Sequence, residues 1–197
     1  MERNVKIVSK CHLWGVDILI FVTLGTQDKD FSRLLNAVEK SISNGNIKEK
    51  VIVQAGFTKF ASDKMEIYDY LEPKKMNEYF DKASLIICHG GVGSILKGLE
   101  KNKKIIAVAR VKKYNEHTND HQLQIVNKFS ELGYILSVID CDDLDNTLKR
   151  VKNFTPKKYI SNNNKFICTI TEYIDKTNYT SWLNKILSLK IKNTKSH

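Results

Sequence analysis

The sequence predicts an α/β fold in which a Rossmann-like parallel sheet carries helices on both faces. Three observations lead to this prediction. Short apolar runs recur along the chain, and segments whose apolar residues have helical spacing lie between them. Several of these runs are uninterrupted, which is typical of strands buried on both faces. The alternation of strands and helices favours a parallel sheet.

The first half of the chain supplies three predicted strands and two helices. Ile18–Leu24 is an uninterrupted apolar run, long enough for a strand and too short to span a bilayer. Within Phe31–Ile42 the apolar residues recur every three or four positions, which predicts a helix. Lys50–Ala55 is a second apolar run, and we expect a third strand at Glu66–Leu71. Pro73 then begins a helix to about residue 80, because proline is favoured in the first helical turn.

The second half continues the alternation. A strand at Leu85–Cys88 leads through a glycine-rich turn into a helix, and Lys104–Ala109 forms the next strand. His117–Leu132 is predicted to be helical, ending at a glycine that suits a C-cap. Tyr134–Ile139 is the last predicted strand, and a helix at Leu144–Val151 follows it.

Length and composition predict one folded domain. A chain of 197 residues with 42% hydrophobic content can bury one core. We assign this domain to residues 18–160, leaving 1–17 as an N-terminal extension of unknown role and 161–197 as a basic C-terminal helical segment. The four cysteines are scattered and no secretory signal is seen, which predicts a reducing cytoplasm and no metal site.

The charge is concentrated at the C-terminal end. The chain carries a formal net charge of +10. A stripe of apolar residues around Trp182 and Leu187 is flanked there by lysines. This segment could pack on its own domain, dock on a partner subunit, or lie on an anionic membrane. A solvated lysine-rich surface is the alternative, and we expect no nucleic-acid partner because no nucleic-acid-binding motif is present.

The segment Cys88–Ser94 is the strongest functional signal in the chain. It joins a strand to a helix, an arrangement that directs backbone N–H groups and the positive end of the helix dipole at one place. Its three glycines lack the Cβ atoms that would hold a phosphate away from the backbone. His89 and Ser94 could reach the same anion. The pattern predicts a diphosphate site, and an ordinary tight turn is the alternative.

A second polar cluster lies in the long segment Arg110–Gln122. Because ligands bind at the carboxyl ends of parallel strands, this segment should lie near the glycine-rich turn. Asn119 and Asp120 offer an amide beside a carboxylate, which can hold neighbouring sugar hydroxyls as donor and acceptor. The alternative for either residue alone is a helix N-cap.

Three segments, Val22–Thr26, His89–Ser94 and Glu116–Gln122, occur in this order along the chain. Together they resemble the C-terminal, nucleotide-sugar-binding half of family 28 glycosyltransferases, and the resemblance covers roughly residues 18–139. Short bacterial subunits of capsule and exopolysaccharide glycosyltransferases are similar, as is the small catalytic subunit that makes dolichol-linked chitobiose in eukaryotes. The resemblance implies the C-terminal half of a GT-B enzyme, with the acceptor half on a separate, membrane-associated polypeptide.

The resemblance also implies roles for individual residues. The donor diphosphate would be bound by Gly25, Thr26, His89, Gly91, Gly93 and Ser94. The donor sugar would be bound by Asp120, His121 and Gln122. The nucleoside side would include Leu71, Met76 and Lys97. Many relatives have a glutamate that binds ribose at the position of Lys97, and a lysine cannot accept a hydrogen bond from a ribose hydroxyl.

The implied reaction is inverting transfer of a sugar from a UDP-sugar to a lipid-linked saccharide, in exopolysaccharide or capsule synthesis. No metal or cofactor is expected, because the helix N-terminus, His89 and Ser94 would stabilise the departing diphosphate. His89 is a candidate catalytic group, although the general base of GT-B enzymes commonly belongs to the acceptor half. We therefore expect a membrane-anchored acceptor-binding partner and a cytoplasmic location on the inner face of the plasma membrane.

Two other functions would need different features. A non-catalytic nucleotide-sugar-binding module would need the same donor site without transfer. A UDP-sugar epimerase would need two such domains in one chain, and 197 residues are too few for that.

Overall fold

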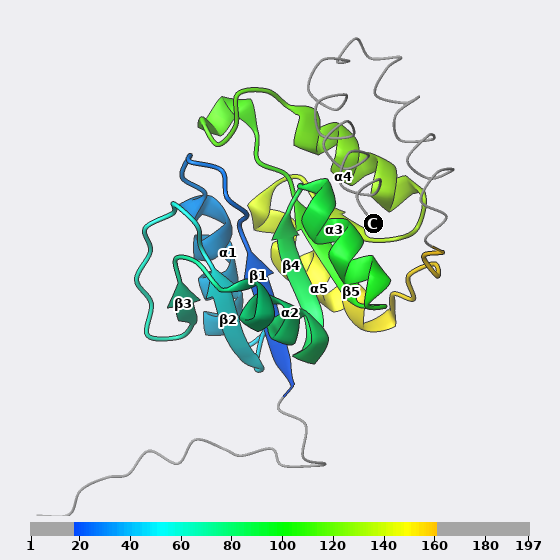
Figure 1. The fold of residues 1–197 in the computed structure, drawn as a ribbon, viewed down its shortest axis with the longest axis horizontal. Helices are drawn as coiled ribbons and strands as arrows, with labels where there is room; N and C mark the ends of the chain where they lie inside the picture. Colours follow the sequence, from blue (N-terminus) through cyan, green and yellow to red (C-terminus); the bar gives the residue numbers. More distant parts are fainter. Residues whose placement is uncertain (1–17, 161–197) are drawn as a thin grey trace, which may run out of the picture. The chain divides into compact units, whose positions relative to one another are not determined.

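The computed structural model describes residues 18–160 and shows a six-stranded, entirely parallel sheet (Figure 1). The strand order is β3-β2-β1-β4-β5-β6. The strands are β1 (Leu19–Thr23), β2 (Lys50–Gln54), β3 (Glu66–Tyr68), β4 (Ala83–His89), β5 (Lys104–Val108) and β6 (Leu136–Val138). The predicted fold class is therefore confirmed. The predicted segments 1–17 and 161–197 lie outside the described residues.

Residues 18–160 also contain five α-helices and two short 3₁₀ turns. The helices are α1 (Ser32–Ser43), α2 (Pro73–Lys82), α3 (Val92–Glu100), α4 (His121–Glu131) and α5 (Leu144–Asn153), and the 3₁₀ turns are η1 (Lys112–Tyr114) and η2 (Cys141–Asp143). Of these, η2 and α5 follow the last strand. Pro73 is the first residue of α2, as predicted. Helix α4 begins four residues later than predicted, because the side chains of 116–120 hold the preceding loop in a non-helical path.

The sheet is buried on both faces because its strands alternate between two apolar layers. Ile20 and Val22 of β1 join the core cluster that contains the buried residues of α1 and α5. On the other face Phe21 is stacked on Tyr79 of α2 at 5.6 Å and meets Phe80 edge-on at 5.3 Å. All five residues of β1 are buried, as an uninterrupted apolar strand requires.

The topology creates one reversal of strand order, at β1 and β4. From β1 the chain proceeds to β2, whereas from β4 it proceeds to β5 on the opposite side. Neighbouring connections therefore leave the sheet in opposite directions and open a crevice at the carboxyl ends of these strands. Thr23 of β1 pairs with Cys88 of β4, so the loop after β1 meets the glycine-rich turn after β4. Among the described helices, none has the length and apolarity that a bilayer crossing requires.

Candidate functional site

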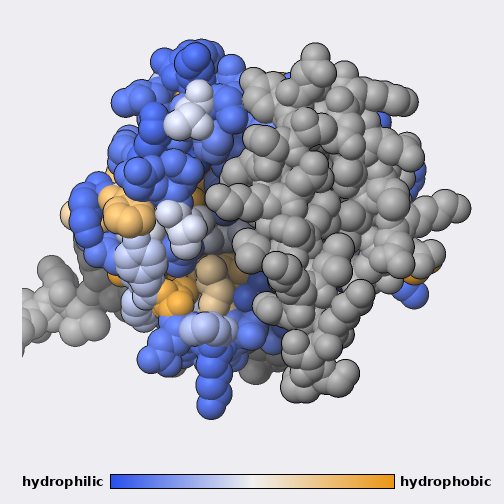
Figure 2. Space-filling model, turned by 45° about the horizontal axis from the view of Figure 1, so that its top comes forward, coloured by the Kyte–Doolittle hydropathy of each residue, from blue (hydrophilic) through white to orange (hydrophobic). Residues whose placement is uncertain are grey.

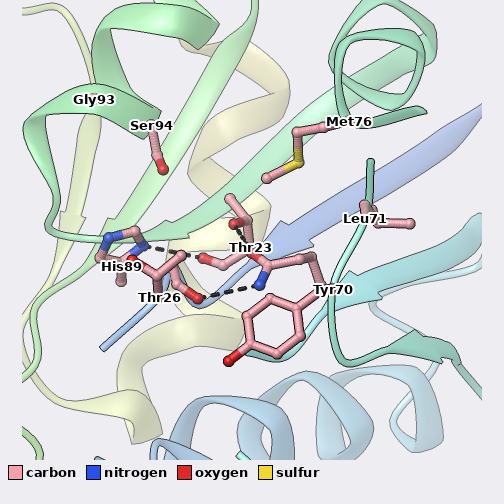
Figure 3. A pocket seen from close by; sticks show the side chains of 10 residues that line it. Thr23, Thr26, Tyr70, Leu71, Met76, His89, Gly93 and Ser94 are labelled. Carbon is pink, nitrogen blue, oxygen red and sulfur yellow. Dashed lines mark hydrogen bonds between the residues drawn. The ribbon is translucent and has the colours of Figure 1, made fainter. Parts of the chain in front are cut away.

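A pocket lies in this crevice, and ten residues line it (Figure 3). Seven of them are predicted site residues: Gly25, Thr26, Leu71, Met76, His89, Gly93 and Ser94. The other three are Thr23, Gln54 and Tyr70, which the sequence did not suggest. Segments far apart in the chain are thus brought together at one edge of the sheet.

His89 stands at the end of β4, with its imidazole packed between two glycines. A Cβ on Gly25 would lie 2.5 Å from the ring, and a Cβ on Gly91 would lie 2.3 Å from Nε2. Gly25 also has a φ of +75°, which side-chain-bearing residues rarely adopt. The missing Cβ of Gly91 thus makes room for the ring of His89, and the role of Gly91 in diphosphate binding stays a prediction.

The surroundings of His89 favour a neutral ring. Its Nδ1 lies 3.3 Å from the carbonyl oxygen of Thr23, and because a carbonyl only accepts, Nδ1 carries the proton of the neutral imidazole. Nε2 is then a hydrogen-bond acceptor. Burial, and to a lesser extent the charges of Arg110 and His117, lower the pKa of His89 to about 4, against the opposing effect of the bond to Thr23. His89 is thus uncharged near pH 7 in the protein described here.

The N-terminus of α3 presents open backbone at the pocket. A Cβ added to Gly93 would meet no atom of residues 18–160 within 4 Å, so within this part of the chain the glycine borders open space. The first N–H groups of a helix have no intrahelical partner, and here the cap residue, Gly91, supplies no side-chain acceptor. Ser94 lines the same pocket one residue further along. This combination of free N–H groups, hydroxyl and helix dipole suits an anion.

The residues predicted to bind the donor sugar do not line the pocket. Gln122 is buried, and its Oε1 accepts a hydrogen bond from the backbone N–H of Arg110 at 3.1 Å. A Cβ on Gly90 would lie 2.8 Å from the side chain of Gln122, so this glycine lets α4 approach the turn. Asp120 accepts from the backbone N–H of Lys112 at 2.8 Å. In the structure Gln122 and Asp120 thus hold the loop by accepting hydrogen bonds from its backbone. His121 is not among the residues that line the pocket either.

A buried arginine and a buried glutamate hold this long loop. The guanidinium of Arg110 is fully buried and donates to the carbonyl oxygens of Leu24 at 3.0 Å and Lys29 at 2.7 Å. Glu116 forms a bidentate salt bridge with Arg33, with N–O distances of 2.7 and 2.9 Å. The sequence did not predict that Arg110 and Glu116 are buried, since a charged residue after a strand ordinarily suggests a solvated loop.

The other end of the pocket is aromatic and apolar. Tyr70, Leu71 and Met76 lie there, across from the side of His89 and Ser94 (Figure 3).

Tyr70 is 54% exposed and meets Phe57 edge-on at 5.9 Å. The coloured part of the surface seen in Figure 2 is largely hydrophilic, with small hydrophobic areas between its polar side chains.

Lys97, which was predicted on the nucleoside side, is not among the lining residues. Its Nζ lies 4.8 Å from the ring centre of Phe80, a cation–π contact on α2. Partial burial lowers the pKa of Lys97. In the structure the ammonium group of Lys97 thus lies against the aromatic ring of α2, and a role for Lys97 on the nucleoside side stays a prediction. Within residues 18–160 no group of three or more histidine, cysteine or acidic side chains could hold a metal ion.

Curated relatives with local sequence similarity carry the name UDP-N-acetylglucosamine transferase subunit ALG13. The protein from Candida albicans is 32% identical over 81 residues, which are 41% of this chain and 26% of the relative. The human protein is 29% identical over 125 residues, which are 59% of this chain and 10% of the relative. The chain thus corresponds to only part of the length of these relatives.

Solved structures share the fold. A solution structure of ALG13 has a TM-score of 0.52 at 23% identity, covering 77% of this chain and 93% of that one. The glycotransferase of kitacinnamycin has a TM-score of 0.53 at 14% identity, covering 77% of this chain and 39% of that one. Residues 19–176 match the glycosyltransferase family 28 C-terminal domain, and the chain belongs to this family.

Proposed function

We propose that this chain is the donor-binding, catalytic subunit of a glycosyltransferase that uses a UDP-sugar and needs a separate acceptor-binding subunit. The observation that carries the proposal is the pocket at the strand-order reversal, where the open N-terminus of α3 faces an aromatic and apolar end. Membership of the family 28 C-terminal domain supports it. The relatives' name, UDP-N-acetylglucosamine transferase subunit, supports both the donor class and the need for a partner.

The pocket suggests how a nucleoside diphosphate would lie. The diphosphate would lie at the first turn of α3, beside Gly93 and Ser94, where N–H groups and the helix dipole favour negative charge. The nucleoside would lie toward Tyr70, Leu71 and Met76. When the sugar–phosphate bond breaks, negative charge grows on the departing diphosphate. Preorganised donors at that position stabilise the transition state, which is the catalytic contribution that we assign to this chain.

His89 has a defined protonation state in this proposal. The neutral ring donates a hydrogen bond from Nδ1–H to the carbonyl oxygen of Thr23 and leaves Nε2 as an acceptor. We assign it no proton transfer, since the acceptor hydroxyl would be delivered by the partner subunit, which would also supply the general base. The donor would need no metal ion, because the helix N-terminus would take the role of a counter-charge to the leaving group.

We extend the proposal to the biological setting. The acceptor would be a lipid-linked saccharide, handled on the cytoplasmic side of a membrane by a membrane-anchored partner, in exopolysaccharide or capsule synthesis. The support for a partner subunit is the relatives' name, whereas the lipid acceptor and the polymer rest on the sequence resemblance alone.

Calorimetry on the purified full chain tests the donor site. UDP and UDP-N-acetylglucosamine should bind, and ADP should bind more weakly. Gly93→Val should weaken UDP binding strongly while thermal unfolding shows an intact fold, since the new side chain would enter open space beside α3. A folded wild-type chain that binds no uridine nucleotide would refute the proposal. Donor binding without transfer, even with the partner subunit present, would favour the non-catalytic module.

A further inference from the structure

The floor of the pocket contains a buried amide that contacts two separate loops. Gln54 is the last residue of β2, is only 3% exposed, and lines the pocket. It pairs in register with Thr23 of β1 on one side and with Tyr68 of β3 on the other. Its side chain therefore lies where the loops that leave β1 and β3 begin, with Gly25 two residues past Thr23 and Asp69 one residue past Tyr68.

Both the nitrogen and the oxygen of this amide have partners in the protein. Its Nε2 donates to the carbonyl oxygen of Gly25 at 3.1 Å and to that of Asp69 at 3.3 Å. Its Oε1 accepts from the Thr23 hydroxyl at 2.7 Å. A rotated amide would direct its oxygen at two carbonyl oxygens, which cannot donate, so the observed orientation is fixed. The Gly25 carbonyl can lie this close to the loop after β2 because residue 56 is a glycine, whose missing Cβ would stand only 2.5 Å from the carbonyl oxygen.

These two contacts set the direction of two further backbone groups. In a planar trans peptide the C=O and the following N–H point in opposite directions. Holding the Gly25 carbonyl therefore orients the N–H of Thr26, and holding the Asp69 carbonyl orients the N–H of Tyr70. Thr26 and Tyr70 both line the pocket, one on the α3 side and one on the aromatic side. One side chain thus holds peptide planes at both ends of the pocket, and at Asp69 it does so together with the backbone N–H of Gly56, which donates to the same carbonyl oxygen at 2.8 Å.

From this geometry we infer that Gln54 is a positioning residue for the donor, which sets the relation between the diphosphate end and the nucleoside end of the pocket. The inference rests on the proposed function for the identity of the ligand. UDP spans both ends and so depends on both peptide planes. Losing the amide should therefore weaken UDP binding about tenfold, which is the effect of one or two lost hydrogen bonds.

The test uses the full chain with Gln54→Met, which keeps the size of the side chain and removes both donors. The matched control is Thr58→Val, which removes a similarly buried side-chain bond, to the backbone N–H of Phe31, outside the pocket. Backbone amide signals of Thr26 and Tyr70, measured by NMR without ligand, should shift in Gln54→Met and stay in place in Thr58→Val. UDP affinity, measured by calorimetry, should fall about tenfold in the first variant and less than twofold in the second.

Unchanged amide signals in a folded Gln54→Met chain would overturn the inference, and so would unchanged UDP affinity. If Gln54→Met does not fold, Thr23→Val takes its place, because it frees Oε1 and should shift the same two amides with a UDP loss of about threefold. A wild-type chain that binds no UDP would refute the proposed function instead, and the ligand-free amide signals would then decide the role of Gln54 alone.

Discussion

The low pKa of His89 predicts that this residue makes the stability of the protein depend on pH. Burial lowers this pKa from the ordinary value of 6.5 to about 4. Between these two values the unfolded chain binds a proton at this position and the folded protein does not. The contribution is therefore fully present above about pH 6.5 and is lost as the pH falls toward 4. At about 1.4 kcal/mol per pKa unit, the whole effect is about 3 kcal/mol.

The comparison of wild type with His89→Gln isolates this effect. Glutamine can still donate to the Thr23 carbonyl but does not titrate, so carboxylates and other histidines contribute equally to both proteins. We expect the free energy of unfolding, measured by urea denaturation, to fall by about 2 to 3 kcal/mol more in the wild type than in the variant between pH 7 and pH 4.5.

The result that would refute the reasoning is a parallel loss of stability in the two proteins. NMR titration of the His89 ring gives an independent check. A ring that protonates near pH 6.5 in the folded protein would show that the imidazole is solvated, and not enclosed between Gly25 and Gly91.

Three further outcomes follow from the contacts. Gly93→Ala should keep or slightly raise the melting temperature while weakening UDP binding. Gly91→Ala should lower the melting temperature, because its Cβ would meet the ring of His89. Equal melting temperatures of the two variants would contradict this expectation. Glu116→Gln should cost about 3 kcal/mol in urea unfolding, because it leaves a partly buried arginine unpaired, while Asp142→Asn in an exposed pair should cost less than about 0.5 kcal/mol. Gln122→Ala should lower the free energy of unfolding by about 1–3 kcal/mol, because it leaves a buried backbone N–H without an acceptor. An unchanged free energy of unfolding would favour a purely sugar-binding role for Gln122.

Local patterns in the sequence were sufficient for the fold and for part of the site. Uninterrupted apolar runs such as the one at β1 predict strands, because burial on both faces requires apolar side chains at every position. The glycine-rich turn between β4 and α3 is also a local signal, since it depends on neighbouring residues. Alternating elements with ligands at the carboxyl ends of the strands then place Gly25, His89 and Gly93 at one edge, and the pocket contains all three.

Other features depend on contacts between distant parts of the chain, which the sequence does not display. Gln54 is polar at the end of an apolar strand, and only the pairing of β2 between β1 and β3 gives its amide two carbonyls to hold. The sequence places a phosphate beside Gly91, and only the structure shows that the ring of His89 lies there. The sequence likewise assigns Gln122 to a sugar, and only the structure shows that its oxygen accepts from the buried N–H of Arg110. The sequence by itself determined which segments form the pocket, because periodicity and turn chemistry are local. Only the tertiary structure decided which polar groups face a ligand and which hold the protein together, because every buried donor and acceptor must first find a partner.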